Sequence, residues 1–219
     1  MSDKICTLVG IGPGLGMAIA KKFGSEGYQI AMIARRSDAI DQYKNILNEQ
    51  EIKAQGFSAD ASNTESLVNA FEKIQQTIGK SEVLIYNAAA LKQGYPMSIT
   101  AEDLVQDFKV NVAGALTCVQ QVTPYMKEQK QGTILLTGGG FGLDPYPQFA
   151  SLSVGKAAIR NLCFSLAKEL EPDGIHVATV TICGVIKPNT QFDPDLIAQA
   201  YWKLHNQKQE TWEREYMYQ

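Results

Sequence analysis

The sequence lacks a surplus of basic residues and has no long hydrophobic run. Its 20 lysines and arginines are outnumbered by 23 aspartates and glutamates, which leaves a net charge of -3. Proteins that bind nucleic acid neutralise phosphates with such a surplus, so nucleic acid is not expected as a partner. No apolar stretch approaches the roughly 20 residues that span a bilayer. A membrane is therefore not expected as a partner either.

Cysteine and histidine are scarce, with four and two residues respectively. Cys6, Cys118, Cys163 and Cys183 lie far apart in apolar segments, without the C-x-x-C spacing or the neighbouring histidines of a metal site. We expect reduced thiols in the core and no bound metal. Met1–Lys4 leads directly into an apolar run of only a few residues, which is too short for the apolar region of a signal sequence and has no small-residue cleavage site. The expected location is therefore the cytoplasm.

Short apolar runs alternate regularly with longer segments of helical period. Strands are predicted at residues 5–10, 29–34, 54–58, 83–87, 133–137, 176–182 and 212–218. Helices are predicted at residues 14–26, 38–49, 64–78, 100–127 (with a break near Asn111), 152–170 and 194–204. Such alternation requires right-handed crossovers and a mainly parallel sheet covered on both faces. The sequence predicts one Rossmann-type, doubly wound α/β domain over residues 1–219, with about seven strands.

Two details of the predicted helices bear on their boundaries and their packing. Ser62 with Glu65, and Thr100 with Asp103, have the spacing of capping pairs at helix starts. The segment 152–170 is apolar almost all round, so it needs cover on two sides. That cover comes either from a partner subunit, in a homodimer or homotetramer, or from another helix of the chain.

A glycine-rich turn joins the first predicted strand to the first predicted helix. Gly10, Gly14 and Gly16 follow the pattern G-x3-G-x-G. Glycine lets the backbone turn tightly and approach a pyrophosphate, whose charge is held by the free amides at the start of the helix. This context predicts a dinucleotide site formed by the three glycines and Leu15.

The end of the second predicted strand indicates which dinucleotide binds. NAD-binding domains usually place a carboxylate there for the ribose hydroxyls, but this strand ends in Ala34, Arg35 and Arg36. A guanidinium binds a 2'-phosphate through charge-assisted hydrogen bonds. The arginines therefore favour NADP(H) over NAD(H). The alternative is an ordinary solvated pair of charges.

With these features in place, the chain resembles the short-chain dehydrogenase/reductase family from about Lys4 to Ile182. Besides the glycine turn, the resemblance includes Asp60, where the family contacts adenine, and Asn87 in N-A-A-A, where the family has N-A-G. It also includes Asn111 in V-N-V-A-G and Lys156 in S-V-G-K-A-A. The resemblance implies that Asp60, Asn87 and Lys156 contribute to cofactor binding. It further implies an oxidoreductase acting on a small carbonyl or alcohol substrate.

The resemblance fails at two catalytic positions. The family carries a tyrosine four residues before the lysine, which exchanges a proton with the substrate oxygen, and an upstream serine, which hydrogen-bonds that oxygen. This chain has Leu152 and Gly139 at those positions. Asn111 and Lys156 remain as catalytic candidates, but the family also uses this lysine to bind the nicotinamide ribose and this asparagine to set the local backbone and a water chain.

Several side chains offer substitutes for the missing acid: Tyr146, Ser151, Ser153 and Lys156 itself. Tyr146 either enters the site from the loop before the helix or packs on the surface. Ser153 lies about 100° from Leu152 around the helix, so it points elsewhere. None of the four is decisive on the sequence alone.

The predicted substrate lid is short, because only about a dozen residues separate Gly184 from the next helix. We expect an open site, or one closed by another subunit. Two functions therefore remain. One is an NADP(H)-dependent oxidoreductase with a non-standard active site. The other is a catalytically silent NADP(H)-binding protein that regulates or joins an assembly.

Overall fold

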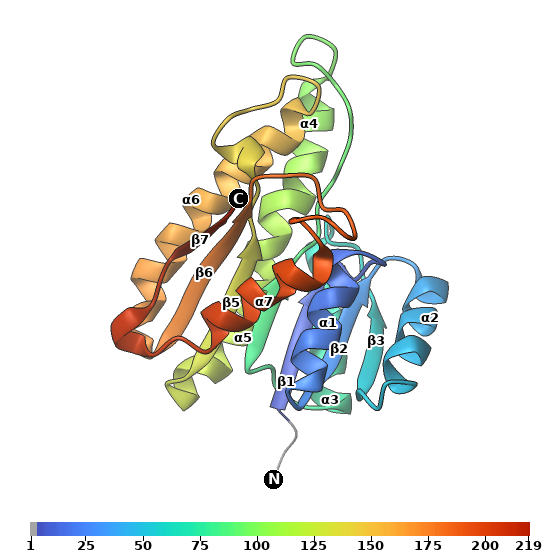
Figure 1. Cartoon of the computed structure of the whole chain (residues 1–219), viewed down its shortest axis with the longest axis vertical. Coiled ribbons are helices and arrows are strands. Elements are labelled where there is room, and N and C mark those ends of the chain that lie inside the picture. The colour runs from blue at the N-terminus through green and yellow to red at the C-terminus, as the bar shows by residue number, and fades with distance from the viewer. Residues whose placement is uncertain (1–3) are drawn as a thin grey trace.

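The computed structural model describes residues 4–219 as a parallel β-sheet with helices on both faces (Figure 1). The sheet contains seven strands in the order β3-β2-β1-β4-β5-β6-β7. The strands are β1 Lys4–Val9, β2 Tyr28–Ala34, β3 Ala54–Ser58, β4 Val83–Tyr86, β5 Gly132–Thr137, β6 Ile175–Ile182 and β7 Glu215–Tyr218. The helices are α1 Leu15–Ser25, α2 Ser37–Asn48, α3 Thr64–Thr77, α4 Ala101–Phe108, α5 Gly114–Gln129, α6 Ala150–Leu170 and α7 Pro194–His205.

The helices form two layers, each with its own apolar core. Helices α1, α2 and α7 pack on one face of the sheet, and α3, α5 and α6 pack on the other. Every strand pair is parallel, as the continuous apolar character of the strands predicts. The predicted Rossmann-type fold is confirmed. Residues 1–3 lie outside the described residues. They belong to the N-terminal segment on which the prediction of a cytoplasmic location rests.

The strand order reverses direction beside β1, which pairs with β2 on one side and with β4 on the other. In doubly wound sheets, ligands bind at the carboxyl ends of the strands at such a switch point. The glycine turn follows β1, the two arginines follow β2, and Asn87 follows β4. The topology therefore brings three segments that are distant in sequence to one edge of the sheet.

Two predicted boundaries differ from the structure. Ser62 does not cap α3, because its hydroxyl and amide bind Asp60; Asn63 caps the helix instead, accepting from the Ser66 amide at 2.9 Å. The last strand begins at Glu215, since a 3-10 turn and the bond from the Trp212 indole to the Gln207 carbonyl (3.1 Å) precede it.

Two other local predictions, a helix cap and a helix break, are confirmed. Thr100 and Asp103 form the predicted capping box. The break near Asn111 is a π-helical turn, Lys109–Ala113, between α4 and α5. The four cysteines are free thiols, three of them buried and Cys183 partly buried. Across residues 4–219 no helix combines the length and the apolar character needed to cross a bilayer.

Candidate cofactor site

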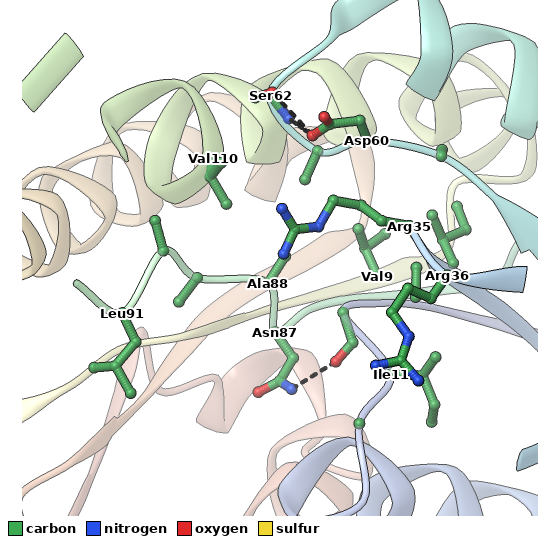
Figure 2. Close-up of a pocket in the computed structure, with 18 of the residues that line it drawn as sticks. Val9, Ile11, Arg35, Arg36, Asp60, Ser62, Asn87, Ala88, Leu91 and Val110 are labelled. Atoms are coloured by element: carbon green, nitrogen blue, oxygen red, sulfur yellow. Dashed lines mark hydrogen bonds between the residues drawn. The ribbon is translucent and has the colours of Figure 1, made fainter. Parts of the chain in front are cut away.

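A cavity of about 630 Å³ lies at the carboxyl ends of β1, β2, β3 and β4 (Figure 2). Its wall is built from four segments at the strand ends, from α2, and from one face of α4 with the turn that follows. The segments at the strand ends are residues 9–13, 33–36, 59–62 and 87–92. The remaining lining residues are Ala39, Tyr43, Gln106, Asp107 and Val110. Of the predicted cofactor residues, the cavity brings together Gly10, Arg35, Arg36, Asp60 and Asn87.

Close backbone contacts explain the glycines at both ends of the turn, Gly10 and Gly16. Gly10 has φ +91°, and a Cβ there would lie 2.4 Å from the Ala88 amide nitrogen, so β1 and β4 approach too closely for a side chain. A Cβ at Gly16 would lie 3.0 Å from the Gly10 carbonyl oxygen, which explains how α1 packs onto the turn. Above Gly12 and Gly14 there is open space. The turn is therefore tight at its ends and accessible in its middle.

The start of α1 is open as well. Gly14 is its N-cap, and no side chain caps the helix. Leu15 is buried, so its side chain belongs to the core and only its backbone is available at the turn. An uncapped helix start carries unpaired amides and a partial positive charge, which attract an anion.

Arg35 and Arg36 extend in different directions from the end of β2. Arg35 reaches across the cavity between the Asp60 loop and Ala88, whereas Arg36 points toward Ile11 of the glycine turn (Figure 2). Both side chains are exposed, and Arg36 pairs with the exposed Asp38 at 3.1 Å. The cavity therefore has a cationic rim.

Asp60 faces Arg35 from the end of β3. Its Oδ1 accepts hydrogen bonds of 2.9 Å from the amide and the hydroxyl of Ser62. The Ser62 amide is the main cause of a lowered pKa of this carboxyl, and the charge of Arg35 adds to the effect. Asp60 is thus an ionised acceptor held in one orientation.

Asn87, Asn111 and Lys156 are tied to the backbone around the site. The Asn87 amide donates to the Gly10 carbonyl at 3.0 Å, and Asn111 Oδ1 accepts from the Ala90 amide at 2.7 Å. Lys156 Nζ donates to the Thr137 carbonyl at 2.6 Å, and burial lowers the pKa of this ammonium to about 8. Asn111 and Lys156 lie outside the cavity wall, on the α5 and α6 side of the sheet.

Residues 4–198 match the family model described as short chain dehydrogenase. The chain belongs to the short-chain dehydrogenase family. A human 3-oxoacyl-[acyl-carrier-protein] reductase is 26% identical over 178 residues, covering 81% of this chain and 74% of that protein. An uncharacterized oxidoreductase of Staphylococcus aureus is 26% identical over 209 residues, covering 91% of this chain and 90% of its own.

Solved structures of short-chain dehydrogenases share the fold. A metagenomic short-chain oxidoreductase in complex with NADP superposes with a TM-score of 0.90 at 22% identity, covering 99% of this chain and 97% of its own. The L-sorbose reductase from Gluconobacter frateurii, complexed with NADPH and L-sorbose, has a TM-score of 0.91 at 21% identity, covering 99% and 95%. At 21% and 22% sequence identity, these two comparisons show a shared fold and nothing further.

In this short-chain dehydrogenase, the positions at which the sequence resemblance predicts the tyrosine and the serine hold a buried leucine, Leu152, and a glycine, Gly139. Leu152 is 6% exposed and lies one helical turn before Lys156 on α6. A Cβ at Gly139 would lie 3.4 Å from the Lys156 side chain, an ordinary contact distance. Lys156 is therefore the titratable group that adjoins both positions.

The other proposed substitutes have different partners. Tyr146 stacks against both Phe141 and Phe149, with ring centroids 5.6 and 6.1 Å away, and these two rings also stack on each other at 5.9 Å. Like Lys156, Tyr146 does not line the cavity. Ser153 donates to the Phe149 carbonyl at 3.0 Å, pointing away as expected. Ser151 donates to Asp107 at 2.7 Å. These contacts leave Lys156 as the best-placed candidate.

The sequence reasoning missed a buried carboxylate in the cavity wall. The side chain of Asp107 is 3% exposed, and it pairs with Lys92 at 3.3 Å while accepting from Ser151 at 2.7 Å. It thereby links α4 to α6 and to the loop after β4. The one available signal was its spacing, since Asp107 lies four residues before Asn111, where α4 continues into the π-helical turn.

Proposed function

We propose that this chain is an NADP(H)-dependent oxidoreductase that interconverts a carbonyl and an alcohol. The proposal rests on one observation: a cavity at the switch point that joins an open glycine turn to Arg35 and Arg36, with no carboxylate at the end of β2. The space above Gly12 and Gly14 and the uncapped start of α1 fit a pyrophosphate. The arginines fit a 2'-phosphate. The neighbours solved with NADP or NADPH support this assignment.

NADPH, when bound, supplies the hydride that reduces the carbonyl carbon. The chain must then deliver a proton to the carbonyl oxygen, because an alkoxide is otherwise left in the site. We assign that proton to Lys156 Nζ, whose pKa of about 8 suits donation near neutral pH. The lysine is left as the neutral amine and regains its proton from water. Asp60, Asn87 and Asn111 act by binding and positioning.

The role of Lys156 predicts a pH dependence of reduction. The ammonium donates only below its pKa, so kcat/KM should fall as the pH rises through about 8. Lys156→Arg keeps the charge but cannot release its proton in this range. We expect this variant to lower the rate about 10²- to 10⁴-fold and to remove the limb above pH 8, as measured by NADPH oxidation with a panel of carbonyls. An unchanged limb in the variant would refute the assignment.

The choice of cofactor is tested at the cationic rim. Arg35→Ala and Arg36→Ala should each weaken NADPH about tenfold, since each removes a charge-assisted contact, and should leave NADH within about twofold. Calorimetric titration measures both affinities. Arg214→Ala is the matched control, because Arg214 is also an exposed, ion-paired arginine but pairs with Glu171 away from the cavity. Equal losses for NADPH and NADH would argue against a 2'-phosphate contact.

Leu152 and Gly139 favour a second candidate function, a catalytically silent NADP(H)-binding protein. The chain keeps the predicted cofactor residues but carries Leu152 and Gly139 where the family has its tyrosine and serine. This candidate requires tight NADPH binding, no turnover with any carbonyl, and an assembly that changes with the cofactor. Sedimentation with and without NADPH examines the last point. It also tests whether the exposed Val154 side of α6 forms the homodimer or homotetramer that we propose.

A further inference from the structure

Thr137, at the carboxyl end of β5, forms hydrogen bonds with three other side chains. Its hydroxyl contacts Asn87 Oδ1 at 3.0 Å and the Tyr201 hydroxyl at 2.7 Å. Its carbonyl accepts from Lys156 Nζ at 2.6 Å. Asn87 in turn donates to the Gly10 carbonyl at 3.0 Å, a bond drawn in Figure 2. One threonine thus connects α7, the glycine turn and the lysine of α6.

The direction of each hydrogen bond in the series from Tyr201 through Thr137 and Asn87 to Gly10 is fixed by the Gly10 carbonyl at its end. The Gly10 carbonyl can only accept, so Asn87 must face it with the amide and present Oδ1 to Thr137. That oxygen also only accepts, so the Thr137 hydroxyl donates to it. Tyr201 must then donate its own proton to Thr137. The order Tyr201 to Thr137 to Asn87 to Gly10 permits no reversal, and bonds aligned in this way strengthen one another.

At its buried position, the Tyr201 hydroxyl would destabilise the protein if it had no hydrogen-bond partner. Tyr201 is fully buried in α7, within the apolar layer that this helix shares with α1, and Thr137 is 7% exposed. A buried hydroxyl without a partner destabilises a protein, whereas phenylalanine would fill nearly the same volume without that cost. Burial also raises the pKa of the phenol, which keeps its proton available for donation. The hydroxyl therefore serves the bond to Thr137.

We propose that Tyr201 and Thr137 are positioning residues that connect the C-terminal helix α7 to the cofactor site. Through Asn87 they hold the Gly10 carbonyl, and with it the shape of the glycine turn, before a dinucleotide arrives. Through the Thr137 carbonyl they also hold Lys156. Helix α7 begins directly after the short lid segment, so the lid and the cofactor turn share one polar connection. The cofactor part of this inference rests on the proposed function.

The test compares Tyr201 of α7 with Tyr28, which contacts the same helix from β2. Tyr201→Phe and Thr137→Val each remove one hydroxyl from the hydrogen-bonded series that leads to Gly10. Tyr28→Phe is the matched control, since the Tyr28 hydroxyl bonds His205 of the same helix at 2.8 Å but has no link to the turn. All three variants should lower the Tm by about 2 to 4 °C. Only the first two should weaken NADPH, by about 5- to 20-fold in calorimetric titration.

Two further variants separate a positioning role from a merely structural one. Thr137→Ser keeps the hydroxyl and should restore NADPH affinity to within about twofold of the parent. The double variant Tyr201→Phe/Thr137→Val should be no weaker than Thr137→Val alone, because both changes interrupt one chain. An NADPH affinity of Tyr201→Phe equal to that of Tyr28→Phe, at equal loss of Tm, would overturn the proposal.

A second readout needs no cofactor, so it separates this proposal from the proposed function. In the cofactor-free protein, amide hydrogen exchange in residues 10–16 should be about tenfold faster in Tyr201→Phe than in Tyr28→Phe. If the parent fails to bind NADPH, the proposed function fails, and this exchange rate still decides whether Tyr201 holds the turn. Equal exchange in the two variants would refute the holding role.

Discussion

The double variant Leu152→Tyr/Gly139→Ser is expected to reduce carbonyls with NADPH faster than the parent chain: only slightly faster if Lys156 already supplies the proton, and about 10²- to 10⁴-fold faster if the parent lacks a general acid. It returns a phenol and a hydroxyl to the two positions where the family places them. Position 152 lies one helical turn before Lys156, so the ammonium can lower the pKa of a phenol there. Steady-state NADPH oxidation with a panel of carbonyls measures the gain.

The structure has room for at least the smaller of these changes. A Cβ at Gly139 would sit 3.4 Å from the Lys156 side chain, so serine enters at ordinary contact distance. Leu152 is 6% exposed, and the larger tyrosine must displace its neighbours slightly. Val154→Tyr is the matched control, because it adds a phenol to the exposed side of the same helix, where Val154 is 47% exposed. That variant should gain nothing.

The outcome distinguishes the two candidate functions. A large gain from an undetectable rate means that the parent is silent because it lacks the acid. A small gain from a measurable rate means that Lys156 already supplies the proton. Rates that do not change, in a variant shown by titration to bind NADPH, would contradict the assignment of positions 152 and 139.

Gly10→Ala is expected to lower the free energy of unfolding by about 2 to 4 kcal/mol and to weaken NADPH more than about 100-fold. The new Cβ would lie 2.4 Å from the Ala88 amide nitrogen and 2.8 Å from the Asn87 carbonyl carbon. Both neighbours are backbone atoms, so β1 and β4 must separate at the cavity. Chemical denaturation and calorimetric titration measure the two effects.

Gly27→Ala provides an unusually close control for this variant. Gly27 also has φ +91°, so both substitutions carry the same backbone strain, but nothing lies within 4 Å of a Cβ at Gly27. We expect it to lose about 1 kcal/mol and no NADPH affinity. If the two variants were equally stable, the close approach of β1 to β4 would not be what requires glycine at position 10.

Much of the fold and half of the site could be predicted because their signals are local. The strand and helix pattern follows from side-chain periodicity over neighbouring residues. The break at Asn111 was visible, although its π-helical form was not. Arg35 and Arg36 were predicted at the site because they follow a strand beside the glycine turn, and both line the cavity. The Ser62 capping prediction was wrong because a hydroxyl in a turn has several backbone partners within reach, and Asp60 competes for it.

Sequence by itself determined the glycine turn, the missing carboxylate after β2, and the leucine and glycine at the catalytic positions, since each is read from register within a short motif. Only the tertiary structure decided the Asp107–Ser151 contact and the chain from Tyr201 through Thr137 to Asn87. Their partners are 44, 64 and 50 positions apart. Strand order and helix packing place such residues together, and no local periodicity records which distant side chains will share a hydrogen bond.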